Sequence, residues 1–274
     1  MKRKLFCEIS PLTYKISVEK NIFLRRLCDL FNRKVRFASD KSGEPLPVRV
    51  YSHKSLIRRC LGNVDMRLQE NKAVNLSIAA PKVTGILIKP GETFSFWRLV
   101  GRDSKRKGYL EGLTIANGKT SSGIGGGMCQ FTNLIHWMVL HSELTITEHH
   151  HHDGFDLFPD FGRQIPFGTG TSVMYNYLDY RVRNDTDRVY QLLVSTDGEY
   201  LCGVLRADKP QNFKYHIKAE DERFVREDGV VYRCGKVVRT TVDCASGNVV
   251  GVEIIRENHA RVMYDTDLIE VREN

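Results

Sequence analysis

The 274-residue sequence lacks any long run of apolar residues. Its longest apolar stretches, such as residues 138–140, are far shorter than the roughly 18 residues that a transmembrane helix needs. A secretory signal peptide is not expected either, because Glu8, Lys15 and Glu19 interrupt the segment where its apolar core would lie. We therefore expect a cytoplasmic protein, either in solution or at the inner membrane surface.

Closely spaced cysteine pairs are also missing. The seven cysteines are an odd number, are widely scattered and contain no CxxC motif. This pattern argues against a disulfide framework and against a thiolate zinc ribbon. We expect most of the cysteines to be reduced and buried.

The signatures of nucleic-acid and nucleotide binding are absent as well. There is no zinc finger, no aromatic RNA-binding motif and no basic run followed by heptads, so nucleic acid is not an expected partner. No Gly-Lys-Ser/Thr follows the glycines as a P-loop would require, and no dinucleotide fingerprint occurs. Ser95 and Ser172 lack the surroundings of a nucleophilic serine.

Positive charge is concentrated in the first quarter of the chain. The formal net charge is +8, and residues 1–75 contain 17 Lys and Arg against 7 Asp and Glu. Residues 76–274 contain 24 against 26. A basic segment of this kind can bind an anionic membrane surface, or it can simply be a solvated face.

The composition, 41% hydrophobic and 27% charged, is that of a globular protein with a substantial core. The order of the patterns predicts an α+β fold in three parts. Residues 1–74 form a basic, mainly helical segment and residues 75–208 a mixed α/β domain. Residues 209–274 form a small β-rich extension.

Helical spacing is clearest in the N-terminal part. Apolar residues recur at intervals of three, four and seven over residues 12–31, which predicts an amphipathic helix with Lys20, Arg25 and Arg26 facing outward. A second helix is predicted over residues 55–68.

Further along, residues 78–96 read as short strands joined by a tight turn at Pro90-Gly91. The glycine-rich segment 112–127 then precedes a buried helix. Residues 180–194 predict an antiparallel pair of strands, and residues 200–204 predict another strand.

The strongest chemical signal is Gly125-Gly126-Gly127-Met128-Cys129-Gln130 at the start of that helix. A helix N-terminus favours a thiolate, and the backbone N–H groups of Cys129 and Gln130 would bind an oxyanion. Glycines Gly125, Gly126 and Gly127 would let a substrate approach closely. The alternative is a buried cysteine at a tight loop-to-helix junction.

Four consecutive histidines, residues 149–152, form the second signal. On a strand, His150 and His152 would share one face and His149 and His151 the other. A histidine beside Cys129 would act as its general base. A nearby aspartate would orient the imidazole: Asp153, Asp156 or Asp160.

Two other interpretations of the histidines stay open. His150, His152 and Cys129 offer a ligand set for zinc, since imidazole and thiolate both bind this metal. Alternatively, the four histidines form a surface cluster without a function. No cofactor is expected apart from this zinc alternative.

Several motifs together are similar to those of the VanW family. They are Lys89-Pro-Gly-Glu-Thr-Phe-Ser-Phe96, GGGMCQFTNL from Gly125 and Leu178-Asp-Tyr-Arg-Val-Arg-Asn-Asp-Thr186. The resemblance covers roughly residues 70–208. The family includes an accessory product of vancomycin-resistance clusters, and related domains occur in bacterial envelope proteins beside peptidoglycan-binding modules. A role in glycopeptide resistance or cell-envelope metabolism is implied, without an established reaction.

The resemblance also selects among residues. His152 lies where the family usually has a histidine, which makes it the favoured partner of Cys129. Gly170 stands where the family commonly has an aspartate, so this chain needs another residue to orient the base or is inactive. Asp179 is retained and either serves this role or packs the hairpin turn. Ser95 and Phe96, in the first motif, are expected to contact substrate.

Two classes of function follow from these residues. The first is a thiol acyltransferase or amidase acting on a peptidoglycan-like peptide, with Cys129 as nucleophile and His152 as base. The second is a non-catalytic module that binds a cell-wall peptide or a partner, in which Cys129 only packs.

Overall fold

A computed structural model describes residues 5–59, 65–116, 119–151, 154–160, 164–175, 178–267 and 269–273. Within them, helices and several sheets confirm the expected α+β class. The helices are η1 (Phe6–Glu8), α1 (Pro11–Phe31), α2 (Met66–Val83), α3 (Phe96–Val100), η2 (Lys105–Lys107) and α4 (Met128–Leu140). The strands are β1 (Arg36–Phe37), β2 (Val48–Leu56), β3 (Ile86–Ile88), β4 (Glu92–Ser95), β5 (Glu111–Ala116), β6 (Lys119–Ile124), β7 (Thr145–Glu148), β8 (Phe155–Asp156), β9 (Arg181–Arg183), β10 (Tyr190–Thr196), β11 (Tyr200–Ala207), β12 (Phe213–Glu227), β13 (Val230–Asp243), β14 (Val249–Val262) and β15 (Val271–Glu273).

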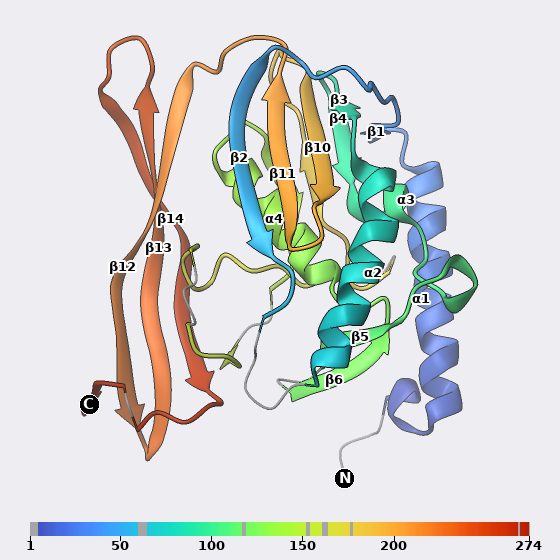
Figure 1. Cartoon of the computed structure of the whole chain (residues 1–274), viewed down its shortest axis with the longest axis vertical. Helices are drawn as coiled ribbons and strands as arrows, with labels where there is room; N and C mark the ends of the chain where they lie inside the picture. The colour runs from blue at the N-terminus through green and yellow to red at the C-terminus, as the bar shows by residue number, and fades with distance from the viewer. Residues whose placement is uncertain are drawn as a thin grey trace.

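The core lies between an antiparallel sheet and two helices. The sheet has the strand order β2-β11-β10-β3, with α4 packed on β2 and β11 and α2 packed on β10 (Figure 1). A Cβ atom on Gly203 of β11 would lie 2.7 Å from Met138 and 2.9 Å from Leu134. The missing side chain at Gly203 therefore lets α4 approach the sheet closely. The predicted buried helix after the glycine-rich segment is confirmed.

A second sheet, in the order β1-β4-β9-β7, lies beside this core. The turn between β3 and β4 is confirmed, with Gly91 at a φ of 77°.

The predicted antiparallel pair over residues 180–194 is wrong, because β9 pairs with β4 and β7, whereas β10 pairs with β3 and β11. The buried Asn184 side chain explains the division, since its amide group donates to the carbonyls of Ile88 and Arg188 and fixes a turn between the sheets. The strand predicted at residues 200–204 is confirmed as part of β11.

The C-terminal part forms a third sheet, in the order β15-β12-β13-β14-β8. Its three main strands are 15, 14 and 14 residues long and stand at the left of Figure 1. The β structure was expected in this part of the chain, but short strands were expected and the strands are long. Register shifts, such as those between Val237 and Val238 and between Thr241 and Val242, break the alternation of side chains and disguise each strand's length in the sequence.

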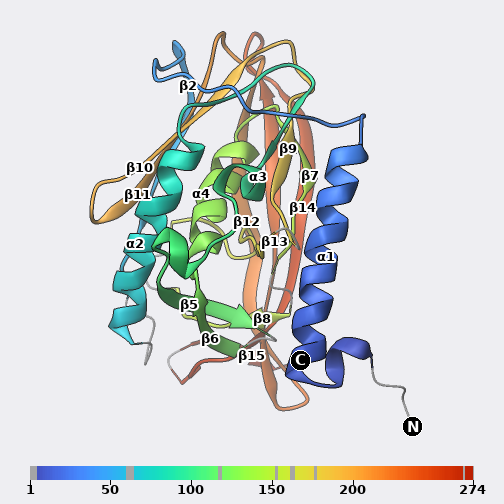
Figure 2. The same ribbon diagram turned by 90° about the vertical axis from the view of Figure 1, so that its right-hand side faces the viewer.

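The amphipathic helix expected over residues 12–31 is confirmed as α1, which lies along the outer edge of the molecule (Figure 2). Its orientation differs from the prediction. Arg25 faces the protein and pairs with Glu148, while Leu30 and Phe31 are each 73% exposed. Glu148 of the second sheet attracts Arg25, and Arg181 of the same sheet attracts Asp29 of the helix, so ion pairing decides which side faces inward.

The helix predicted over residues 55–68 is also wrong in place. Residues 55 and 56 end strand β2, which pairs with β11, and α2 begins only at Met66 with Asp65 as its N-cap. Residues 60–64 lie outside the described residues. Strand pairing with β11 outweighs the local helical spacing. Residues 78–83 correspondingly belong to α2 rather than to a strand.

Of the six cysteines that the structure describes, Cys234 is buried and Cys28 and Cys244 are exposed, so the expectation of mostly buried cysteines is wrong. Among the described helices, none combines the length and apolar character needed to cross a membrane. The division at residues 74 and 208 stays a prediction.

Candidate functional site

Other protein atoms pack tightly against each glycine of the turn before α4, residues 125–127. Gly125 and Gly127 have φ angles of 78° and 109°, which favour glycine. A Cβ atom on Gly126 would lie 2.3 Å from the carbonyl carbon of Gly112. Asp103 fills the corresponding space at Gly125, and Lys72 fills it at Gly127. The glycines therefore serve close packing of the turn, and their contact with a substrate stays a prediction.

Cys129 is the second residue of α4 and is half-buried. Burial raises the pKa of its thiol above the ordinary value, although hydrogen bonding from the backbone of Val173 and of Cys129 itself acts in the opposite direction. Desolvation thus opposes the thiolate that the helix N-terminus was expected to favour, and the role of Cys129 as nucleophile stays a prediction. A base must deprotonate this thiol before it can act as a nucleophile.

The segment 169–173 crosses α4 beside Cys129. Thr171 donates two hydrogen bonds to the side-chain oxygen of Asn133, from its backbone N–H at 2.6 Å and from its hydroxyl at 2.8 Å. The Thr171 hydroxyl also lies 3.3 Å from the carbonyl oxygen of Cys129 and contacts Thr132. These bonds hold the segment against the first turns of the helix.

The histidines that the structure describes alternate in direction, as predicted. His149 donates to the carbonyl of Gly170 at 2.9 Å and its ring stacks on that of His136, with centroids 4.4 Å apart. The ring of His151 lies 6.5 Å from that of His149, whereas His150 turns to Glu148, with 3.1 Å between Nε2 and Oε1. His149 and His151 therefore share one side.

His152 and Asp153 lie outside the described residues, so the role of His152 as base stays a prediction. His151 is the residue that sequence reasoning passed over. Its Nε2 lies 3.4 Å from the position that a Cβ atom on Gly170 would occupy, and Asn133 lies 4.0 Å from the same point. The aspartate that the family commonly has at this position would therefore stand beside His151.

His136 is buried behind these residues. It shares a hydrogen bond with Tyr180, with 3.0 Å between Nδ1 and the phenol oxygen. Burial, followed by the nearby His149 and His151, holds the pKa of His136 well below its ordinary value. His136 therefore stays neutral near pH 7.

Asp179 takes part in a separate network. Its carboxylate accepts hydrogen bonds from the Ser95 hydroxyl at 2.5 Å and from the Arg181 Nε at 2.8 Å. It also accepts from the backbone N–H groups of Trp97 and Tyr180. These donors hold Asp179 at the start of α3, where Ser95 is the N-cap. The described partners of Asp179 do not include a histidine.

Two further predicted residues also have structural contacts. The side-chain amide of Gln130 donates to the Ser55 hydroxyl and the Leu56 carbonyl, which ties α4 to β2. The backbone N–H of Gln130 donates to the Gly127 carbonyl at 3.0 Å, so it would have to leave that bond to bind an oxyanion. Phe96 is fully buried and packs against Phe131.

Two buried ionisable groups flank the glycine turn. Burial raises the pKa of Asp103 to about 6. Burial, with repulsion from Arg59 and Arg58, lowers the pKa of Lys72 to about 7. Both residues precede the turn by many positions, so no sequence spacing could reveal this contact.

Comparison with known proteins identifies the domain that carries these residues. A family model described as "VanW like protein" matches residues 71–206. The vancomycin B-type resistance protein VanW of Enterococcus faecalis (strain ATCC 700802 / V583) is 41% identical over 200 residues, covering 73% of this chain and 72% of that protein. The chain belongs to the VanW family. The uncharacterized protein YoaR of Bacillus subtilis (strain 168) is 29% identical over 118 residues, covering 42% of this chain and 36% of YoaR. No solved structure matches the chain.

A cleft of about 910 Å³ separates the VanW domain from the C-terminal sheet. His136 and His149 line its VanW side, and Gly168 and Thr169 lead from it toward the segment beside Cys129. Cys129 is not among the described residues that line this cleft. The cleft carries charges of both signs: Arg188, Arg239, Arg256, Glu143, Asp185, Asp187 and Glu253. Sequence reasoning missed it because strands outside the VanW match close one side.

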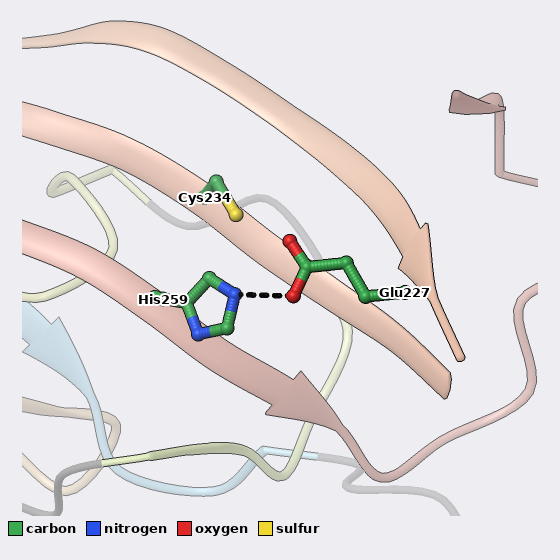
Figure 3. A group of neighbouring side chains, drawn as sticks. All are labelled: Glu227, Cys234 and His259. Carbon is green, nitrogen blue, oxygen red and sulfur yellow. Dashed lines mark hydrogen bonds and ion pairs between the residues drawn. The ribbon is translucent and has the colours of Figure 1, made fainter. Parts of the chain in front are cut away.

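A group of potential metal ligands lies outside the VanW match. The ligand atoms of Glu227, Cys234 and His259 all lie within 4.8 Å of one another (Figure 3). Among the described residues, no group of three includes Cys129. The alternative zinc set of Cys129, His150 and His152 depends on His152, outside those residues, and stays a prediction.

Proposed function

We propose that this VanW-family protein acts in resistance to vancomycin, by a step on a peptidoglycan-like peptide of the cell envelope. The name of its Enterococcus faecalis relative, which is 41% identical, supports the association with resistance. The chemistry is proposed from the residues around Cys129. The proposed reaction is acyl transfer or amide hydrolysis with Cys129 as nucleophile.

One observation carries this proposal. The carbonyl of Gly170 accepts a hydrogen bond from His149, and a Cβ atom on Gly170 would lie 3.4 Å from His151 Nε2. The next residue, Thr171, donates to Asn133, one turn after Cys129. A thiol at a helix N-terminus and a pair of imidazoles thus converge on one short segment. Such a convergence supplies the nucleophile and the base that thiol catalysis requires.

The proposed reaction begins with a protonated thiol. A histidine of the 149–152 run accepts the proton from Cys129 as the sulfur attacks the peptide carbonyl. A thioester forms, and the amine leaves with the proton that the histidine returns. Water or an acceptor amine then attacks the thioester and releases Cys129. The backbone of Val173 and that of Cys129 hydrogen-bond to the sulfur and favour its thiolate form.

The cleft is the proposed binding place of the peptide. Its lining carries charged groups of both signs, such as Arg239 and Asp185, which suit a chain that carries both ammonium and carboxylate groups. His149 lies in the cleft wall, so a bound peptide would reach the histidine pair from this side.

A non-catalytic binding module is the second candidate. It is favoured by two observations, the raised pKa of the Cys129 thiol and the absence of Cys129 from the described cleft lining. In this case the cleft holds a peptide or a protein segment, and Cys129 only packs against segment 169–173.

Resistance of cells that depend on this protein separates the two candidates. Cys129→Ser and Cys129→Ala are each compared with Cys244→Ser, which removes an exposed thiol. The catalytic proposal expects both Cys129 variants to lose resistance while their circular dichroism and unfolding midpoints match those of Cys244→Ser. Full resistance in folded Cys129→Ala would exclude catalysis and favour binding.

A further inference from the structure

The helix α1 presents its apolar residues to solvent. Of its 21 residues only Ile22 is buried. Leu12, Ile16, Phe23 and Leu30 are between 49% and 73% exposed. At about 100° per residue these four fall within about 40° of one another on the helix surface. They form an apolar stripe, called here the α1 stripe, which is interrupted between Ile16 and Phe23 by Glu19, the ion-pair partner of Arg102.

The opposite side of α1 is polar and holds the helix to the protein. Asp29 accepts from Arg181 at 2.6 Å, and Arg25 pairs with Glu148. Arg25 and Asp29 lie about 100° or more around the helix from the α1 stripe. The helix is thus attached by ion pairs and exposes the side that would normally be buried.

The apolar surface continues beyond the helix. Leu5, Phe6 and Ile9, in and beside η1, are each more than half exposed. Exposed apolar groups of this extent mark an interaction site rather than an ordinary surface. Figure 1 shows α1 on the side of the molecule away from the β12–β14 sheet.

Charge indicates which partner the α1 stripe meets. Lys15, Lys20, Arg33 and Lys34 are exposed and form no ion pair with another described residue. The first 75 residues carry the excess of 17 cationic over 7 acidic side chains. A helix with an apolar face and flanking lysines lies in the interface of an anionic bilayer, with its cations at the headgroups.

We propose that the α1 stripe docks this protein on an anionic membrane surface, with α1 lying parallel to the bilayer. The stripe enters the outer acyl region, and the four free cations contact anionic headgroups. The helix spans about 31 Å, which is long enough to hold the protein in a fixed orientation. This proposal does not rest on chemistry at Cys129.

Vesicle flotation of the full chain tests the docking. The vesicles contain equal parts of phosphatidylglycerol and phosphatidylcholine, or phosphatidylcholine alone. The double variant Phe23→Asp, Leu30→Asp should bind the anionic vesicles at least about tenfold more weakly than the unmodified protein. The matched control is Val252→Asp, Ile254→Asp on β14, whose residues are 67% and 52% exposed and whose binding should change less than about twofold.

The charge and the occupant are tested separately. Lys20→Gln, Lys34→Gln should weaken binding to the anionic vesicles about tenfold and leave the low affinity for neutral vesicles unchanged. Failure of the unmodified protein to bind anionic vesicles would overturn the proposal. Equal loss in the β14 control would do the same. A lipid-free dimer that Phe23→Asp, Leu30→Asp converts to a monomer, without vesicle binding, would assign the stripe to a second copy instead.

An independent observation concerns Glu227, Cys234 and His259, which come from β12, β13 and β14 (Figure 3). Cys234 and His259 are direct cross-strand partners. His259 Nε2 lies 2.9 Å from Glu227 Oε2, and its ring stacks on Tyr232 at 4.4 Å between centroids. Cys234 is buried beneath this pair. The three ligand types converge from three strands.

The geometry points to a zinc site formed by Cys234, His259 and Glu227. Thiolate, imidazole and carboxylate are the ligands that zinc prefers, and three of them leave a fourth position for water. Tetrahedral zinc places its ligand atoms about 3.3–3.8 Å apart. The ligand atoms now lie within 4.8 Å of one another, so side-chain rotations that bring them about 1 Å closer are sufficient for zinc coordination. The Cys234 proton passes to solvent on binding.

Metal content of untagged full chain tests the site after chelator treatment and reloading with Zn²⁺ or Co²⁺. One bound metal and a thiolate-to-Co²⁺ absorption band are expected, and both should be lost in Cys234→Ser and His259→Gln. Cys244→Ser, which removes an exposed cysteine just after the far end of β13, should keep both. No metal in the unmodified protein would overturn the proposal. Metal that survives Cys234→Ser and is lost in Cys129→Ser would also overturn it, by placing the ion at Cys129.

Discussion

Asn133 accepts two hydrogen bonds from Thr171 on one side-chain oxygen, from the backbone N–H at 2.6 Å and from the hydroxyl at 2.8 Å. Asn133 lies one helical turn after Cys129, so this pair fixes the segment that passes the thiol. Asn133 therefore helps to position this segment, together with the bonds that His149 and Thr132 make to it.

Replacing Asn133 by alanine should destabilise the protein by about 1–3 kcal/mol, because two donors of Thr171 lose their acceptor. Urea unfolding measures the effect. Asn71→Ala is the control, since its exposed amide donates one bond to Glu111 and should cost under about 0.5 kcal/mol. Equal losses in the two variants would show that the Thr171 segment is held by other contacts.

Gly126→Ala should destabilise the turn before Cys129. The new methyl group would lie 2.3 Å from the carbonyl carbon of Gly112, so backbone must move. Overpacking of this kind costs about 1–3 kcal/mol or more. Gly43→Ala is the matched control, because no atom lies within 4 Å of the added carbon there and the change should be near neutral. Thermal unfolding of both variants checks this, and a stable Gly126→Ala protein would contradict the packed turn.

Gly170→Asp should restore the acidic partner that this chain lacks. The new Cβ atom would stand 3.4 Å from His151 Nε2, so the carboxylate would favour the protonated imidazole. Titration of the His151 ring followed by NMR should move upward by about one pH unit. Gly170→Asn has the same shape without the charge and should leave the titration in place. A shift of equal size in both variants would attribute the change to shape alone.

Lys72 should make stability depend on pH. Its pKa falls from 10.5 to about 7 on burial, so between these values the unfolded chain holds a proton that the folded protein lacks. Stability therefore rises with pH from about 7 toward 10.5. Lys72→Met should remove this rise, which is on the order of a few kcal/mol.

Unfolding of Lys72→Met and of Lys34→Met, an exposed lysine, is measured from pH 6 to pH 10 in urea. The Lys34→Met curve should run parallel to that of the unmodified protein. A parallel curve for Lys72→Met as well would mean that Lys72 keeps its proton in the fold.

The sequence predicts the parts of the fold that local patterns determine. The helix α4 follows from the spacing of Phe131, Leu134, Ile135 and Met138, all of which are buried. The glycine turn before it follows from the backbone conformations that only glycine adopts readily. In these places local preference and tertiary packing agree.

Long-range pairing decides the rest. Residues 55 and 56, where helical spacing predicted the start of a helix, instead end strand β2, because β11 pairs with it over residues 48–56. The side of α1 that faces the protein is opposite to the predicted one, because Glu148 and Arg181 attract the charged side of the helix. For the same reason the cleft and the Glu227, Cys234 and His259 group were invisible in the sequence, since each unites residues from separate strands.

The central claim is that the Cys129 thiol is protonated in the free protein and gives up its proton to a nearby histidine only during the reaction. The most direct test is the pH dependence of iodoacetamide labelling, followed peptide by peptide, with exposed Cys28 and Cys244 as internal references. Because burial raises the pKa of the Cys129 thiol, its labelling should reach half-maximum at a higher pH than either reference. A midpoint below both references, rising in His151→Ala, would reveal a preformed thiolate and imidazolium pair and contradict this account.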